Sequence, residues 1–202
     1  MATAINGSET LTEPITAEKW AAIEGPPHYE LLDGTLKEKA PVAVWHDILL
    51  VHLLRCLANF IEAHSLGELV SSTTPLRISA YRGRKPDIFF IPKSLYSLVG
   101  KNLFRGIPPL VIEILSPSNE REDRVEKHRE YAELGIGQYW IVDFPNRRIE
   151  VHELRPQPNG SRDYELVDSP VGEAVFRPSM FPGLEIPLAK IWPTEFGDRT
   201  DE

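Results

Sequence analysis

The chain contains a single cysteine, Cys56, so it cannot form an internal disulfide. Because Cys56 lies in an apolar stretch with helical spacing, we expect a buried, unreactive thiol, and we expect a reducing cytoplasm as the location. The N-terminus lacks a basic start followed by an apolar core, so no signal peptide is expected. The most apolar run, residues 48–61, is interrupted by His52 and Arg55 and is too short to span a bilayer. We therefore expect no membrane association.

Sequence signatures of two large enzyme classes are also missing. No Gly-x-Ser-x-Gly elbow and no phosphate-binding P-loop occur in the chain. A net charge of −8 argues against binding nucleic acid through the whole surface. Residues 81–105 differ, because they carry six basic side chains against one acid. Such a run is usually a solvated loop, and a segment that meets phosphates is the alternative.

The length and composition indicate one globular α/β domain. The chain has 202 residues, of which 42% are hydrophobic and 26% charged, as is ordinary for a protein with a proper core. No internal repeat or Ser/Gly linker divides it. We expect a mobile N-terminus at residues 1–14, a single domain at 15–192 and a C-terminal tail at 193–202. Within the domain we expect a central mixed β-sheet flanked by helices.

Local patterns predict the order of the elements. Thr16 is a plausible N-cap for a short helix that Gly25 would end, and Asp33-Gly34 is a hairpin signal. Apolar residues at helical spacing, among them Ile48, predict a long helix over residues 45–66. The remaining predicted elements are strands at 67–80 and 85–92 joined by a turn at 81–84, a strand at 108–118, a helix at 119–134, and a strand, turn and strand at 138–154.

Three acids occupy apolar strand positions. Glu113 lies in the middle of a nearly all-apolar strand, where it shares one side with Val111 and Leu115. Asp87 begins the apolar run 88–92, and Glu30 is flanked by apolar residues in a shorter strand. If these carboxylates meet, they repel and raise one another's pKa unless a cation neutralises them. Mg²⁺ prefers oxygen ligands, so the pattern favours a magnesium site. Solvated strand ends are the alternative.

A lysine in the following helix is a candidate partner. Asp123, Lys127 and Tyr131 recur every four residues, with Leu134 next on the same helix face. If Tyr131 and Leu134 pack on the sheet, Lys127 points toward the strand end that holds Glu113. The alternative is an exposed lysine, which is the usual environment of this residue type.

Histidine and serine provide weaker candidates. His46 begins the long helix and could lie beside Glu30, and a structural histidine bound to Asp47 or a loop is an equal alternative. A zinc site of His28, His52 and Cys56 is disfavoured because no second cysteine supports it. The serines at positions 116 and 118 are expected to cap the next helix and not to act as nucleophiles.

The order of these residues resembles a known family. A Pro-Asp at the start of one strand, a Glu in the next strand and then a helix is the pattern of the PD-(D/E)xK nuclease superfamily. The chain looks most like its Uma-type family of putative restriction endonucleases over residues 15–192. The resemblance rests on residues 29–36, His46, and residues 85–92, 110–143 and 181–192. It implies a restriction-endonuclease-like fold.

The resemblance also implies an activity and its ligands. The expected reaction is metal-dependent hydrolysis of phosphodiester bonds in nucleic acid, with DNA as the expected substrate. Asp87 and Glu113 would hold Mg²⁺, for which Mn²⁺ could substitute, together with Glu30 and the backbone carbonyl of Ile114. His46 is a further catalytic candidate. Analogy with the superfamily suggests a homodimer.

One position departs from the superfamily pattern. The usual lysine belongs two residues after Glu113, and Leu115 stands there. In Uma-type sequences a lysine of the following helix is thought to substitute, and here that residue is Lys127. It would orient the attacking water or stabilise the transition state. The basic residues that precede Asp87 would grip the nucleic-acid backbone, namely Arg82, Arg84 and Lys85.

Two other readings stay open on the sequence alone. In the first, the chain is a catalytically inactive nuclease-fold module that binds nucleic acid or a protein partner. In the second, it is a structural or interaction protein whose acids are solvated. Binding of a divalent metal distinguishes the three readings. The enzyme requires it, the inactive module is compatible with it, and the structural protein should not show it.

Overall fold

The computed structural model describes residues 13–23, 28–116, 119–158 and 160–193. The predicted mobile N-terminus and C-terminal tail lie almost entirely outside these residues, as do Gly25 and Ser118. The proposed domain boundaries therefore stay predictions from the sequence.

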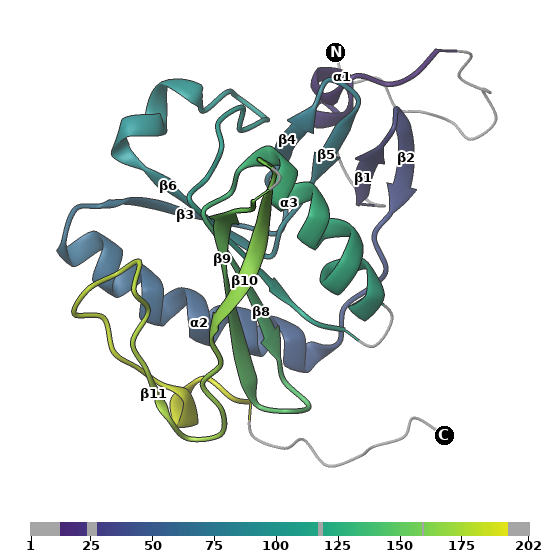
Figure 1. The fold of residues 1–202 in the computed structure, drawn as a ribbon. Helices are drawn as coiled ribbons and strands as arrows, with labels where there is room; N and C mark the ends of the chain where they lie inside the picture. Colours follow the sequence, from purple (N-terminus) through teal and green to yellow (C-terminus); the bar gives the residue numbers. More distant parts are fainter. Residues whose placement is uncertain (1–12, 24–27, 117–118, 159, 194–202) are drawn as a thin grey trace, which may run out of the picture.

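The largest sheet has six strands in the order β10-β9-β8-β7-β6-β3. Its pairings are antiparallel except between β7 and β8, which run parallel. The predicted mixed sheet flanked by helices is thus confirmed (Figure 1). In chain order the strands are β3 (Gly67–Ser71), β6 (Ile88–Pro92), β7 (Leu110–Ile114), β8 (Gln138–Asp143), β9 (Arg148–Pro156) and β10 (Arg162–Asp168).

A second, four-stranded antiparallel sheet has the order β2-β1-β5-β4. Its strands are β1 (Tyr29–Leu32), β2 (Thr35–Glu38), β4 (Leu76–Ser79) and β5 (Arg82–Arg84). The hairpin prediction is confirmed, since Asp33 and Gly34 adopt φ angles of 49° and 79°. The predicted turn at 81–84 is wrong, because residues 82–84 form β5. A short pair, β11 (Val175–Phe176) and β12 (Ile186–Pro187), completes the strands described.

The glycine at position 83 favoured the prediction of a turn, but packing explains why a glycine stands at this position of β5. A Cβ atom on Gly83 would lie 2.1 Å from the ring of Trp20, so the strand needs a residue without a side chain where the indole covers it. Trp20 belongs to helix α1 (Ala17–Ala21), whose predicted N-cap is confirmed: the Thr16 side chain accepts a hydrogen bond from the Lys19 N–H. Contact with α1 thus decides the identity of a residue in the small sheet.

Helices cover both faces of the large sheet (Figure 1). Helix α2 (Val44–Ala63) packs on one face, together with β11 and β12. Helix α3 (His128–Leu134) packs on the other and continues directly from a π-helical segment, η2 (Glu122–Lys127). Two short 3₁₀ segments are also present, η1 (Lys93–Leu98) and η3 (Leu188–Lys190), and Leu188 of η3 is buried in the core on the α2 face. All five residues of β7 are buried, as the apolar run predicted.

The sequence suggested that residues 48–61 are too short to span a bilayer. Helix α2 as a whole has twenty residues, however, so its length does not exclude a membrane span. Among the described helices, only α2 is long and apolar enough to cross a membrane, and core helices of soluble proteins meet the same two criteria. Its buried side packs in the core formed with the large sheet, through Leu49, Leu50, Leu53, Leu57 and Ile61. The side chain of Val51, which contributed to the sequence periodicity, is 51% exposed.

Candidate active site

The two central carboxylates come from neighbouring strands. Strands β6 and β7 pair with Ile88 opposite Ile112, so one further step in this antiparallel register brings Asp87 opposite Glu113. Both side chains are buried on the face that α3 covers, since Phe89 and Val111 of that face pack in the same apolar cluster. The structure therefore brings together the two acids that the sequence singled out.

Asp87 is held by a histidine and by the backbone of β7. Its Oδ2 atom accepts a hydrogen bond from the Ile114 N–H at 2.8 Å and lies 3.1 Å from Nε2 of His46. Burial raises the pKa of Asp87, but the hydrogen bond and charge of His46, together with Lys39 and Lys127, bring it below the usual value. Asp87 is therefore an ionised carboxylate.

His46 contacts Asp87 and not Glu30, which was one of the two environments suggested by the sequence. Burial lowers the pKa of His46, but the hydrogen bond and charge of Asp87 outweigh burial and raise it overall. Its Nδ1 lies 3.7 Å from the Asp47 carboxylate and has no hydrogen-bond partner among the described residues. The contact with Asp87 thus favours the protonated form of the buried imidazole.

The surroundings of Glu113 stabilise an ionised carboxylate less well than those of Asp87 do. Its Oε1 accepts a hydrogen bond from the Tyr131 hydroxyl at 2.8 Å and lies 3.1 Å from Nζ of Lys127. Burial raises the pKa of Glu113 to about 7, because the Lys127 ammonium offsets only part of this cost while Asp87 and Asp123 add to it. The ionised form of Glu113 is therefore poorly stabilised at this buried position.

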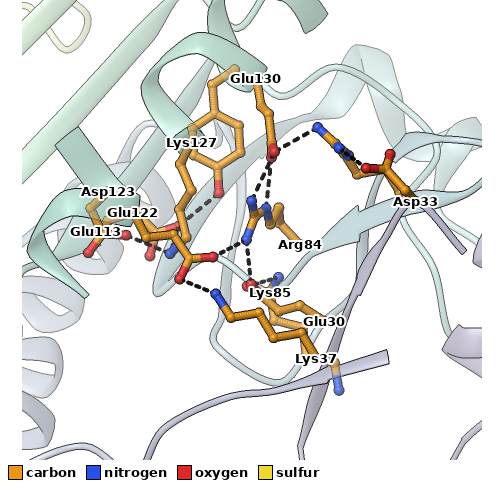
Figure 2. A network of polar contacts seen from close by, with 12 residues as sticks. Glu30, Asp33, Lys37, Arg84, Lys85, Glu113, Glu122, Asp123, Lys127 and Glu130 are labelled. Carbon is orange, nitrogen blue, oxygen red and sulfur yellow. Dashed lines mark hydrogen bonds and ion pairs between the residues drawn. The ribbon is translucent and has the colours of Figure 1, made fainter. Parts of the chain in front are cut away.

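Lys127 points into this cluster from η2 and is buried (Figure 2). Its Nζ lies 2.7 Å from Oδ1 of Asp123, one turn earlier. Burial lowers the pKa of Lys127, but the charges of Glu113 and Asp123 raise it well above the usual value, so the side chain stays cationic. The structure thus places Lys127 beside Glu113 and not in solvent. Leu115, where the superfamily has its lysine, packs in the apolar cluster under α3.

Asp123 is a residue to which sequence reasoning assigned no role, although it shares the helix face of Lys127. Its side chain is buried, and Oδ1 receives no well-directed hydrogen bond despite its short distance to Lys127. Burial raises the pKa of Asp123, and Lys127 offsets only part of this effect. The four-residue spacing to Lys127 was the available signal, but it is also the spacing of an ordinary surface ion pair.

Glu30 is buried close by but is bound to other groups. Its Oε2 lies 2.7 Å from Nη1 of Arg84, and its Oε1 accepts a hydrogen bond from the Lys85 N–H at 3.2 Å. Burial raises the pKa of Glu30, but Lys127, Arg84 and Lys39 outweigh it and lower the pKa overall. Glu30 is therefore an ionised partner of Arg84, and the structure does not group it with Asp87 as the sequence suggested.

Arg84 requires a correction, because it is fully buried and cannot contact a phosphate as it lies here. Three carboxylates surround its guanidinium group, those of Glu30, Glu122 and Glu130 (Figure 2). This arrangement connects the small sheet to η2 and α3. Arg82 is 24% exposed and pairs with Glu130 and Asp33, so it is only partly available to a ligand.

Lys85 is half-buried and lies over the ring of Trp20, with Nζ 5.7 Å from the ring centroid. The ammonium group of Lys39, a residue that sequence reasoning did not single out, donates a hydrogen bond to the Lys85 carbonyl at 2.8 Å. Burial lowers the pKa of Lys85, and the charge of Lys39 lowers it further. Neither ammonium forms an ion pair with any residue that the structure describes.

The structure also bears on the remaining candidates. Within the described residues, no three His, Cys, Asp or Glu side chains are arranged as a ready-made metal cluster. The imidazole of His52 contacts the Ile191 carbonyl at 2.9 Å, which is a structural role and not a zinc site. Ser116 lies buried just after β7, and its carbonyl accepts the Asn119 N–H.

The acid cluster nevertheless suits a divalent cation. Asp87 and Glu113 offer two carboxylates side by side, and Mg²⁺ in proteins is often bound by one or two carboxylates, with its other positions left to water and phosphate. The pKa values of Asp123 and Glu113 are both raised, chiefly by burial, and a bound cation would stabilise the ionised form of each carboxylate. The donor set therefore fits the group, although Glu30 is not part of it.

Comparison with known proteins gives the following results. A family model named Uma2, described as "Putative restriction endonuclease", matches residues 16–189. A crystal structure of a putative nuclease belonging to DUF820 from Anabaena variabilis ATCC 29413 superposes with a TM-score of 0.69 at 17% sequence identity. The match covers 89% of this chain and 98% of the other, and it shows a shared fold. No curated protein matches the chain.

Proposed function

Since this chain belongs to the Uma2 family of putative restriction endonucleases, we propose that it is a metal-dependent endonuclease that hydrolyses phosphodiester bonds in DNA. The observation that carries the proposal is the buried grouping of Asp87, Glu113 and Lys127 on two adjacent strands and the helical segment that follows them. A buried carboxylate pair beside a buried lysine is costly to maintain for stability alone, which favours a catalytic role.

In this proposal Asp87 and Glu113 hold Mg²⁺, or Mn²⁺ in its place, with the backbone carbonyl of Ile114. When bound, the cation supplies Lewis acidity that neutralises charge developing on the phosphate and makes water a stronger nucleophile. His46 keeps Asp87 ionised and fixes its orientation through the 3.1 Å contact. Tyr131 plays the corresponding part for Glu113 by donating its hydroxyl hydrogen bond.

Lys127 acts on the substrate in this scheme. Its ammonium group is cationic and already lies 3.1 Å from Glu113, so it can hold a non-bridging phosphate oxygen or the attacking water without a long movement. Asp123 anchors the same ammonium group from one turn earlier. A lysine on the helix can thus supply the charge that Leu115 cannot.

The first test is metal binding, because it needs no knowledge of the substrate. Mn²⁺ is titrated by calorimetry into the wild type, Asp87→Asn and Glu113→Gln, and circular dichroism confirms that each variant is folded. We expect binding by the wild type and at least about tenfold weaker binding by each variant, since each removes a charged ligand. Glu185→Gln, a change at an exposed surface carboxylate, serves as the matched control.

The second test is cleavage of supercoiled plasmid and of single-stranded DNA, with Mg²⁺, Mn²⁺ or EDTA. Metal-dependent nicking that Asp87→Asn and Lys127→Met abolish supports the proposal. Metal binding without cleavage of any DNA or RNA substrate would instead support the inactive binding module, which the presence of Leu115 also fits. Absence of both metal binding and cleavage would refute the proposed endonuclease. The homodimer and the cytoplasmic location stay predictions from the sequence.

A further inference from the structure

A cavity of about 750 Å³ lies beside the candidate active site. Its wall is formed by α1, by the turn between β3 and β4, and by residues 96–104, and Lys85 contributes to it from the small sheet. Lys85 precedes Asp87 by two residues, and its N–H donates to Glu30. The cavity and the carboxylate cluster are therefore adjacent, with Lys85 at their boundary.

The lining combines aromatic surface with polar groups. Trp20 and Phe104 lie in the wall but are almost fully buried, so Tyr96, which is 41% exposed, provides the accessible aromatic surface. Threonine and asparagine side chains of the same wall, at positions 73, 74 and 102, offer hydrogen-bond donors and acceptors. Aromatic surface with a few hydrogen-bonding groups is the lining that proteins use to hold a nucleobase, and the volume lies within the range of small-molecule sites.

Cations mark the side of the cavity that faces the acids. Lys85 lines the cavity and Lys39 lies next to it, and neither ammonium group forms a direct ion pair with a carboxylate of the described residues, although Glu30 acts on both at longer range. Two half-buried ammonium groups without a direct ion-pair partner favour an anion between them. The paired lysines are therefore the place where a phosphate can approach the candidate site.

We propose that this cavity binds one nucleoside of the nucleic-acid substrate, with its base against Tyr96 and its phosphate at Lys39 and Lys85. The inference rests on the proposed function, because it names the part of the substrate that is held next to the scissile bond. It also predicts a property that the hydrolytic site does not require: a single nucleotide should bind without any divalent cation. A base held in this way must be unstacked from its neighbours, so single-stranded or locally opened substrates are favoured.

The test uses the four 2′-deoxynucleoside 5′-monophosphates with full-length protein in EDTA, followed by ¹H–¹⁵N chemical-shift titration. We expect saturable binding with a dissociation constant of about a millimolar or below, and at least about tenfold weaker binding of deoxyribose 5-phosphate, which lacks the base. Tyr96→Ala and Lys85→Met should each weaken nucleotide binding by about tenfold, since one removes the stacking surface and the other a phosphate cation.

Matched controls separate these effects from general ones. Tyr81→Ala changes a tyrosine of similar exposure outside the cavity, and Lys93→Met changes an exposed lysine that does not line it; both should bind nucleotide like the wild type. Because these titrations are made in EDTA, they measure nucleotide binding independently of the proposed metal site. Binding that depends on Tyr96 and Lys85 would keep the inference intact even if no nuclease activity were found.

The inference is overturned if no nucleotide binds up to roughly ten times the expected dissociation constant. Equal binding of deoxyribose 5-phosphate, or unchanged binding by Tyr96→Ala and Lys85→Met, would overturn it as well. In those cases metal-dependent cleavage that requires Asp87 would still support the endonuclease, so the two proposals fail separately.

Discussion

Removal of the Arg84 guanidinium group should be among the most damaging single changes in the protein. Arg84→Leu keeps an apolar stem but leaves three carboxylates without their shared cation. Glu130 and Glu122 retain other partners, since Arg82 lies 2.9 Å from the first and Lys37 lies 2.7 Å from the second. Glu30 loses its one ion pair with a described residue and keeps one backbone hydrogen bond, from the Lys85 N–H.

The magnitude follows from burial. Removing one partner of a buried ion pair costs about 3–5 kcal/mol, and the partial compensation at Glu130 and Glu122 favours the lower end, about 3 kcal/mol. The pKa of Glu30 is lowered in the folded protein, so its contribution to stability is present above its unfolded value of 4.5 and is lost as the pH falls through the folded value. The deficit of Arg84→Leu should therefore be largest near neutral pH and shrink in acid.

Urea unfolding followed by circular dichroism measures the loss, at neutral pH and again below pH 4.5. Arg82→Leu is the matched control, since its partly exposed ion pairs should cost no more than about 1 kcal/mol. In the double variant Arg84→Leu/Glu30→Gln, about 1 kcal/mol or more should be recovered, because the uncompensated charge is removed. The reasoning is refuted if Arg84→Leu costs no more than Arg82→Leu at neutral pH, or if the deficit does not depend on pH.

Four further outcomes are expected. Lys127→Met should reduce DNA cleavage by about a hundredfold or more while Mn²⁺ still binds in calorimetry, whereas loss of metal binding would contradict its assignment to the substrate. Because the pKa of Glu113 rises from 4.5 to about 7 on folding, metal-free stability should fall by up to about 3 kcal/mol as the pH rises from 4.5 to about 7, a slope that urea titrations of Glu113→Gln should lack. Tyr131→Phe removes a buried hydrogen bond and should cost about 1–2 kcal/mol in urea unfolding, and an unchanged midpoint would exclude that bond as a support of Glu113. Gly83→Ala should cost about 1–3 kcal/mol through its clash with Trp20, as a lowered thermal midpoint would show.

The acids and the lysine could be found from the sequence because their positions depend on local periodicity. Strand alternation put Glu113 on the same side as Val111, and four-residue spacing put Lys127 on the face of Tyr131. Both relations span only a few residues, and the structure keeps both. The hairpin at Asp33-Gly34 was predictable for the same reason, since its backbone geometry restricts the residues that can form it.

Which charged side chains pair with one another could not be predicted from such short-range patterns. Arg84 and Glu30 are 54 residues apart in the chain, and their pairing depends on how the small sheet packs beneath α3. The same is true of His46, which contacts a carboxylate 41 residues away. The basic run before Asp87 looked like one phosphate-binding surface, yet tertiary packing buries Arg84, leaves Arg82 partly exposed and directs Lys85 toward the cavity.

The sequence by itself therefore determined the family, the mixed sheet and the identity of the central acids and lysine, because each is encoded in short-range pattern and residue type. Only the tertiary structure decided which charges are neutralised internally and which remain for a ligand. Glu30 and Arg84 form a direct ion pair, whereas Lys39 and Lys85 form none with any of the described residues. The physical reason is that a charge's role depends on its burial and on its nearest opposite charge, and both are set by contacts between segments distant in the chain.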